Sequence, residues 1–216
     1  MRVRFRLPRQ RRDGKHQKIL NAAVKVFAQK GFFNAKVSEI AKEARVADGT
    51  IYLYFKNKDD ILIHLFEEEM EKIIRGMRER LQASADPLEK LKIFIHTHLG
   101  LVESNPAMAE VIQVELRQSN KFMKDYDNRK FHEYLNILAE IVREGQQKGL
   151  IRQNVLPSVA KRVIFGALDE MSTYWVFSKR RSKLLEEVAA QVCEILIRGL
   201  AEGSSSMAAE AAASGN

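Results

Sequence analysis

Apolar residues recur every three or four positions along most of the chain, which is the period of an α-helix. After Lys58 this spacing continues for more than five turns, which predicts one long helix. The whole pattern predicts an all-α fold of about nine helices. We expect them at Lys15–Lys30, twice between Val37 and Phe55, at Lys58–Ala83, from Pro87, from Pro106 to Arg117, at Lys121–Gln147, from Pro157, and at Leu184–Leu200.

The two short helices between Val37 and Phe55 are separated by a tight turn, which is the pattern of a helix-turn-helix. Ile51 and Phe55 are four residues apart and are expected to face inward together. Asp48 is the expected N-cap of the second helix, because its carboxylate can accept from free backbone N–H groups. Such a second helix can enter a DNA major groove. The side chains left for contacts outside the core are Thr50, Tyr52, Leu53 and Tyr54.

The net charge of +8 is concentrated at the N-terminal end of the 216 residues. Residues 1–60 contain 15 Lys and Arg against 6 Asp and Glu, whereas the other 156 contain 21 against 22. This distribution favours a phosphate-binding head on a near-neutral body. Residues 1–13 are expected to form a flexible basic arm, which either enters a minor groove or attracts phosphates non-specifically. Residues 203–216, rich in Ser and Ala, are expected to be disordered.

Several classes of protein are disfavoured by the composition. No apolar run approaches the roughly 20 residues that a membrane helix needs, and no signal-peptide core follows the N-terminal arginines. The single cysteine, Cys193, cannot form a disulfide within the chain, as is typical of a cytoplasmic protein. No catalytic spacing or metal-binding pattern stands out, so we expect neither an enzyme nor a cofactor or metal site.

The stretch Asp48-Gly49-Thr50-Ile51-Tyr52-Leu53-Tyr54-Phe55-Lys56-Asn57-Lys58, with Asp60-Ile61-Leu62 after it, resembles the TetR family of bacterial one-component repressors. The resemblance implies a helix-turn-helix domain at 14–60 and a ligand-binding and dimerisation domain at 61–202. It also implies a homodimer that binds a palindromic operator in the cytoplasm, associated with the nucleoid when bound.

The same resemblance assigns the DNA contacts. Tyr54 and Lys58 correspond to positions that bond phosphates, with Lys56 a weaker candidate. Base or backbone contacts are implied for Thr50, Tyr52 and Leu53, and Gly49 allows a close approach. Further candidates are Lys36, Ser38 and Asp48, and core packing is the alternative for Tyr52.

The head departs from the family pattern at two places. Ala35 and Lys36 stand where Ser or Thr is usual, so Asn34 becomes the candidate cap of the first short helix. Phe32 and Phe33 before it are expected to enter the core. Arg45 stands at the corner, where Gly is frequent. A left-handed backbone there would cost about 1 kcal/mol.

Further along, Gln113–Asn120, Tyr134–Leu138 and Ile164–Gly166 are similar to the branch of the family that regulates fatty-acid degradation. The likeness implies long-chain acyl-CoA as the effector, with an apolar tunnel for its chain. Plain core packing is the alternative for each lining residue, and for His98 that means a hydrogen-bonded core histidine. Arg117 could instead pair with Glu115 or a partner subunit. The candidate ligand residues are Phe94, His98, Leu101, Val111, Val114, Arg117, Tyr134, Leu138, Ile141 and Phe165, and the candidate cations for CoA are Arg117, Lys121, Arg129 and Arg143.

The last two expected helices carry more apolar surface than one neighbour can cover. A second copy of the chain is the simplest cover, through a four-helix interface that is usual in the family. The expected interface residues are Ala167, Met171, Tyr174, Val188, Val192 and Ile195.

Two other functions remain open from the sequence. One is a multidrug-responsive repressor with an aromatic pocket, for which Trp175, Tyr174 and Asp169 are candidates. The other is a dimer that holds DNA non-specifically or only binds a ligand, which the arginine-rich arm suggests.

Overall fold

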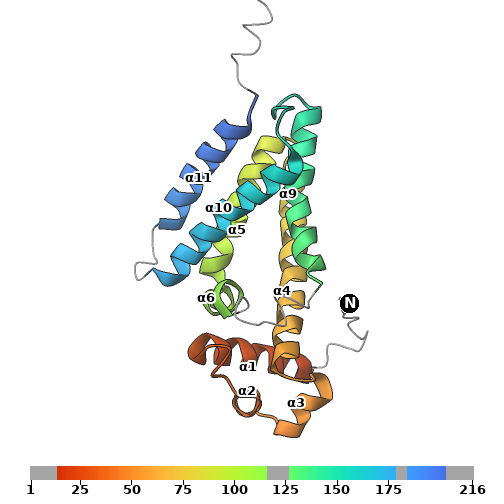
Figure 1. The fold of residues 1–216 in the computed structure, drawn as a ribbon, viewed down its shortest axis with the longest axis vertical. Coiled ribbons are helices and arrows are strands. Elements are labelled where there is room, and N and C mark those ends of the chain that lie inside the picture. The colour runs from red at the N-terminus through yellow and green to blue at the C-terminus, as the bar shows by residue number, and fades with distance from the viewer. Residues whose placement is uncertain (1–13, 116–126, 179–183, 203–216) are drawn as a thin grey trace, which may run out of the picture. The chain divides into compact units, whose positions relative to one another are not determined.

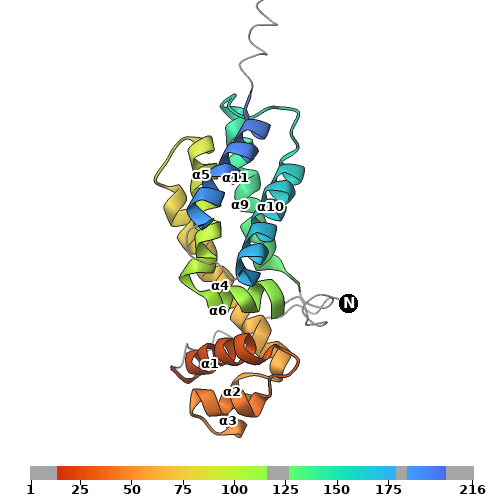
Figure 2. The ribbon, with the colours of Figure 1, turned by 90° about the vertical axis from the view of Figure 1, so that its left-hand side faces the viewer.

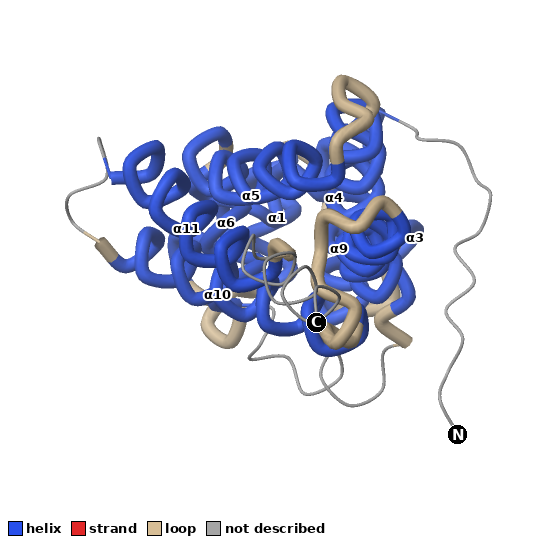
Figure 3. Tube along the Cα trace, turned by 90° about the horizontal axis from the view of Figure 1, so that it is seen from above, coloured by secondary structure: helices blue, strands red, loops and turns tan. Residues whose placement is uncertain are grey.

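A computed structural model describes residues 14–115, 127–178 and 184–202 (Figure 1). These residues form nine α-helices and one π-helical segment, and within them Figure 3 shows no strand. The predicted all-α fold is therefore confirmed. The elements are α1 (Gly14–Lys30), α2 (Val37–Ala44), α3 (Asp48–Tyr54), α4 (Lys58–Leu81), α5 (Pro87–Ser104), α6 (Pro106–Glu110), the π-helix η1 (Val111–Glu115), α9 (Arg129–Gln147), α10 (Pro157–Phe177) and α11 (Leu184–Leu200).

Two predicted helices differ from the observed ones. The helix expected from Pro106 to Arg117 is α-helical only to Glu110 and then widens into η1. The helix expected from Lys121 begins at Arg129, whose N–H donates to the carbonyl of Asp127 at 2.7 Å. Asp and Asn favour such turns because their side chains compete for backbone groups. Residues 116–126, and with them Arg117 and Lys121, lie outside the described residues, as do the arm and the tail.

The chain divides into two compact units, and each contains several segments. The first comprises Met1–Ile73, Leu101–Phe131 and Ser172–Ser178, and the second comprises Ile74–Gly100, His132–Met171 and Lys179–Asn216. The boundaries between the two units therefore lie inside four helices, α4, α5, α9 and α10. The predicted domain boundary at residue 60 stays a prediction.

In the first unit, α1 is the central element. It contacts α2 and also α6 and η1, so it is covered on more than one side. Its apolar stripe at helical spacing is buried, and Ala22 and Val24 are buried in addition; the stripe comprises Ile19, Leu20, Ala23, Val26 and Phe27. Gly31 ends the helix with φ of +76°, a conformation that glycine adopts without strain. Phe32 is buried after it, but Phe33 is 64% exposed, so the expectation that both enter the core is wrong for Phe33.

In the second unit, α5, α9, α10 and α11 run alongside one another (Figures 1 and 2). Their inward faces form a core that includes Phe94, Leu138 and Leu168, each of which is fully buried. Gly145 is required for the close approach of the α9–α10 loop, because a Cβ there would lie 2.5 Å from Cδ1 of Ile151.

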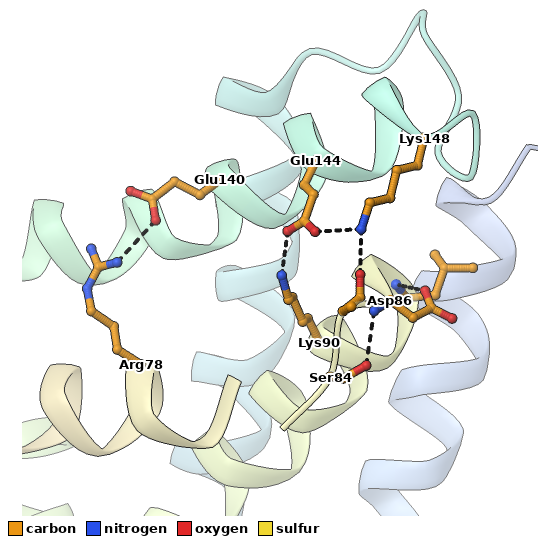
Figure 4. A network of polar contacts seen from close by, with 9 residues as sticks. Arg78, Ser84, Asp86, Lys90, Glu140, Glu144 and Lys148 are labelled. Atoms are coloured by element: carbon orange, nitrogen blue, oxygen red, sulfur yellow. Dashed lines mark hydrogen bonds and ion pairs between the residues drawn. The ribbon is translucent and has the colours of Figure 1, made fainter. Parts of the chain in front are cut away.

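A polar network fastens the α4–α5 loop to α9 in this second unit (Figure 4). Glu144 accepts from Lys90 at 2.6 Å and from Lys148 at 2.8 Å, and Lys148 also donates to the carbonyl of Ala85. The hydrogen bond from Lys148, and after it the one from Lys90, makes the largest contribution to lowering the pKa of Glu144. Asp86 caps α5 by accepting from the N–H of Leu88 at 2.8 Å.

The corner of the helix-turn-helix is left-handed, as the sequence allowed. Arg45 has φ of 57° and ψ of 47°, and its side chain is exposed. A non-glycine residue in this conformation places its Cβ close to the following carbonyl oxygen.

We expect Arg45→Gly to raise the free energy of unfolding by about 0.5–1 kcal/mol, because the relief of strain exceeds the added entropy of the unfolded chain. Urea unfolding monitored by circular dichroism measures the change. Arg45→Ala is the matched control, since alanine keeps the Cβ and should give no gain. Equal stabilisation by both variants would mean that loss of the charge, and not of the Cβ, is responsible.

Candidate functional site

The helix α3 presents two different faces. Ile51 and Phe55 are each 1% exposed, as predicted, and anchor the helix to the core. On the opposite side Tyr52 is 59% exposed and Leu53 is 82% exposed. Core packing of Tyr52 is therefore wrong. No atom lies within 4 Å of a Cβ built at Gly49, so the start of the helix is open to a close approach. This surface suits a recognition helix, although the individual contacts with DNA stay predictions.

The N-terminus of α3 is arranged differently from the prediction. Ala47 occupies the N-cap position, and its carbonyl accepts from the N–H of Thr50 at 2.8 Å. Asp48 is the first residue of the helix and makes no cap, so the predicted N-cap is wrong. Its exposed carboxylate still lies in the first turn, where it interacts favourably with the partial positive charge of the helix N-terminus.

The N-terminus of α2 is capped without Asn34. Lys36 is the N-cap residue, and Oε2 of Glu39 accepts from its backbone N–H at 3.0 Å. The Asn34 amide instead donates to the carbonyl of Lys30 at 3.2 Å, at the end of α1, so its predicted role is wrong. Because Glu39 supplies the cap, the side chains of Lys36 and Ser38 remain exposed at this helix start.

The two lysines between α3 and α4 have different surroundings. Lys56 is exposed, and its backbone N–H donates to Oδ2 of Asp60 at 2.9 Å. Lys58 is half-buried, and its ammonium donates to the backbone carbonyls of the α1–α2 loop. This environment does not match the phosphate contact predicted for Lys58.

His16 lies behind α3 in the first unit, and sequence reasoning did not find it. The His16 ring stacks on Phe55 with centroids 4.9 Å apart and meets Tyr54 edge-on at 6.1 Å. Burial lowers the pKa of His16, with Glu68 at 3.5 Å acting in the opposite direction. The His16 ring thus packs against the end of the recognition helix. Its only sequence signal is its place one turn before the apolar stripe of α1.

In the second unit, an aromatic cluster surrounds one buried histidine. Nδ1 of His98 and the hydroxyl of Tyr134 are 2.7 Å apart, and the rings of Phe94 and Phe165 lie beside this pair. Burial lowers the pKa of His98 to about 4, with Asp169 opposing the shift, and burial also raises the pKa of Tyr134. The pair is neutral at physiological pH. This confirms His98 as a hydrogen-bonded core histidine, while its contact with a ligand stays a prediction.

The predicted ligand residues fall into both compact units. Phe94, His98, Tyr134, Leu138, Ile141 and Phe165 belong to the second unit, and all are buried except Phe165, which is half-buried. Leu101, Val111 and Val114 belong to the first unit, where Val111 is fully buried and the other two are half-buried. Arg129 and Arg143 are both exposed. These placements describe apolar interiors and exposed cations, which an amphipathic effector requires.

The helices α10 and α11 leave apolar side chains uncovered. Tyr174 is 58% exposed and Ile195 is 70% exposed, and the remaining predicted interface residues, Ala167, Met171, Val188 and Val192, are half-buried. Three further exposed residues on α10 were not predicted for the interface: Val159, Val163 and Phe177. Val159 and Val163 are four residues apart and Phe177 is fourteen residues further on, and both spacings return to one side of a helix, which was the available signal.

In the described ranges no helix is long and apolar enough to cross a membrane. Among the same residues, no group of three or more His, Cys, Asp or Glu side chains is arranged to hold a metal ion.

The helical fold and the exposed α3 define a helix-turn-helix DNA-binding regulator. Residues 19–65 match the family model described as bacterial regulatory proteins of the tetR family, and residues 66–199 match the one described as the C-terminal region of YsiA-like proteins. The chain belongs to the TetR family, as the resemblance indicated.

Several relatives are similar over nearly their whole length. The fatty acid metabolism regulator protein of Bacillus subtilis is 43% identical over 186 residues, which are 86% of this chain and 95% of the relative. The crystal structure of the regulator FadR from Bacillus subtilis in complex with stearoyl-CoA has a TM-score of 0.80 and 43% identity, covering 85% of this chain and 98% of that one. The fatty acid degradation regulator FadR from Bacillus halodurans has a TM-score of 0.81 and 40% identity, covering 87% and 97%.

We expect acid to weaken the fold through His98. Its folded pKa of about 4 lies below the unfolded value of 6.5, so stability is complete above pH 6.5 and is lost as the pH falls toward 4. The contribution of His98 to the free energy of unfolding should fall by about 2 kcal/mol between pH 8 and pH 5.

Urea unfolding at both pH values measures this difference, and His98→Gln is the control because glutamine retains a hydrogen-bonding group but does not titrate. The variant should lose less stability on acidification than the wild type, which removes the parallel effect of His16 from the comparison. Equal losses in the two proteins would contradict the assignment to His98.

Proposed function

We propose that this protein is a homodimeric repressor of fatty-acid-degradation genes, which long-chain acyl-CoA releases from a palindromic operator. The observation that carries the proposal is the 43% identity, over 86% of the chain, to a fatty acid metabolism regulator. A FadR structure of the same identity was determined with stearoyl-CoA. As a regulator, the protein would act on DNA in the bacterial cytoplasm and would catalyse no reaction.

The chemistry of the interior supports an acyl chain as the ligand. Each buried methylene group contributes about 0.8 kcal/mol, so a long chain gains most from an apolar environment such as the one around Phe94, Leu138 and Ile141. The CoA phosphates need cations, for which Arg129 and Arg143 are exposed candidates. Arg129 and Lys130 also lie close enough to Glu67 to oppose the upward shift that burial causes in its pKa.

Release from DNA requires that the effector bind two states of the dimer with different affinities. Recognition helices of a dimer bind successive major grooves about 34–36 Å apart, and a change in their spacing lowers the affinity. Within the first unit, α1 packs on α6 and η1 as well as on α2. A displacement of α6 by a ligand would therefore reach the helix-turn-helix directly through α1.

The multidrug alternative is not favoured by the aromatic residues proposed for it. Tyr174 is 58% exposed, whereas its neighbour Trp175 is 6% exposed, so the two rings point in different directions along α10. An aromatic cage for a cation needs several rings that face one site. These two do not supply it.

The test is a titration of the complex between the protein and a palindromic duplex that the wild type selects from a random pool. We expect stearoyl-CoA to release the duplex at one molecule per subunit, while stearate, free CoA and a cationic dye leave it bound. Fluorescence anisotropy measures release, and native mass spectrometry counts the bound effector. Release by the dye and not by stearoyl-CoA would refute the acyl-CoA proposal in favour of a multidrug repressor.

The proposed dimer is tested separately. We expect Ile195→Glu to convert the dimer into a 24.8-kDa monomer, because it places a charge in an apolar face that a second copy would cover. Sedimentation velocity measures the mass. Leu53→Glu, on the exposed side of α3, is the matched control, and it should abolish DNA binding but leave the dimer intact. A dimer that persists in Ile195→Glu would place the interface elsewhere.

A further inference from the structure

Lys58 begins α4 in a setting that is unfavourable for a cation. It is the first residue of the helix, where the backbone N–H groups carry partial positive charge. The helix is capped instead by Asn57, whose side-chain oxygen accepts from the N–H of Asp60 at 2.9 Å. Lys58 therefore does not cap its own helix, and its ammonium is bonded by other groups.

Those groups are the carbonyl oxygens of the α1–α2 loop, which comprises residues 31–36. Nζ of Lys58 lies 2.5 Å from the carbonyl oxygen of Phe32 and 3.0 Å from those of Phe33 and Ala35. It also lies 4.6 Å from the centroid of the Phe32 ring, within the range of a cation–π contact. The ammonium thus connects the start of α4 to a loop that is more than twenty residues away in sequence.

These bonds use the whole donor capacity of the side chain. A lysine ammonium has three N–H groups, and three carbonyl oxygens accept from them. A phosphate oxygen could be bound only after one of these bonds had broken. The geometry therefore opposes a direct phosphate contact by Lys58 in the conformation described.

The loop held by Lys58 leads directly into the start of α2. Lys36 ends the loop and is the N-cap residue of α2, with an exposed side chain. The ammonium of Lys36, exposed beside the partial positive charge of this helix start, is suited to a phosphate of the DNA backbone. The place of this helix start relative to α4 depends on the loop, and the loop is fixed by the ammonium of Lys58.

We propose that Lys58 is a positioning residue for DNA binding, which holds the α1–α2 loop so that Lys36 meets the DNA backbone, and is not itself a phosphate contact. The proposal rests on the proposed function, because it presumes that this head binds DNA. Two lysines therefore serve one contact with the DNA backbone. Lys36 makes the contact, and Lys58 supports it by holding the loop that carries Lys36.

The first experiment needs no DNA. We expect Lys58→Met to increase amide hydrogen exchange at least about tenfold in a peptide spanning residues 31–40, because the loop loses its attachment. Lys58→Arg should not restore protection, since a planar guanidinium fork cannot direct three donors to convergent carbonyls as a compact ammonium does. Lys56→Met, an exposed lysine two residues away, is the control and should leave this exchange unchanged. Unchanged exchange in Lys58→Met would overturn the proposal, whatever the protein binds.

The second experiment is a double-mutant cycle with Lys36→Met, measured on the duplex selected by the wild type, at a temperature where circular dichroism shows every variant folded. In the wild-type background, Lys58→Met should raise the Kd at least about tenfold. In the Lys36→Met background it should change the Kd less than about threefold, because the contact it supports is already absent.

The salt dependence of binding separates the two roles. Each phosphate contact contributes about 0.9 to the slope of log K against log salt concentration, or about 1.8 for two subunits. Lys36→Met alone and the double variant should show the same slope. If the slope of the double variant were instead smaller than that of the wild type by about 3.6, the sum of two separate contacts, and Lys58→Arg kept full affinity, Lys58 would bind phosphate directly. Failure of the wild type to select any duplex would instead refute the proposed function, and the exchange result would still decide the role of Lys58 in the loop.

Discussion

The packing of α1 on two sides is the constraint on which the DNA-binding head depends. A helix that buries only one stripe of side chains packs against a single layer, whereas α1 contacts α2 as well as α6 and η1. Ala22 and Val24 are buried outside the stripe that the helical period defines. Because one rigid helix touches both groups of elements, a displacement of α6 or η1 cannot leave α2 undisturbed.

Buried polar groups give the head its specific geometry. Asp60 is 2% exposed and accepts from the backbone N–H of Lys56, while its own N–H donates to the side chain of Asn57. Nδ1 of His64 is 2.8 Å from the carbonyl oxygen of Asp60. Each of these bonds fixes the corner between α3 and α4. Apolar packing alone would hold the helices together but would tolerate small rotations, whereas directional bonds set the angle at which the recognition helix is presented.

Local periodicity was sufficient for most of the fold. The buried positions Ile51 and Phe55 and the exposed Leu53 follow from helical spacing alone, since that spacing decides which side of a helix a residue occupies. The motif from Asp48 to Lys58 was long enough to identify the family. Predictions failed where the outcome depended on competition for backbone groups. Asn34 caps α1 and not α2, because Glu39 supplies the cap of α2, and α9 begins at Arg129, after a turn at Asp127, although the apolar pattern allowed an earlier start.

The sequence by itself determined the all-helical class, the helix-turn-helix and the concentration of positive charge at the N-terminal end. Only the tertiary structure decided which polar side chains are used within the protein and which are left for a partner. His98 and Tyr134 are 36 residues apart and form one buried neutral pair, and Lys58 donates to carbonyls 23 to 26 residues before it. The physical reason is that periodicity encodes the face of an element, whereas a hydrogen bond between distant residues depends on how loops and helices pack in three dimensions.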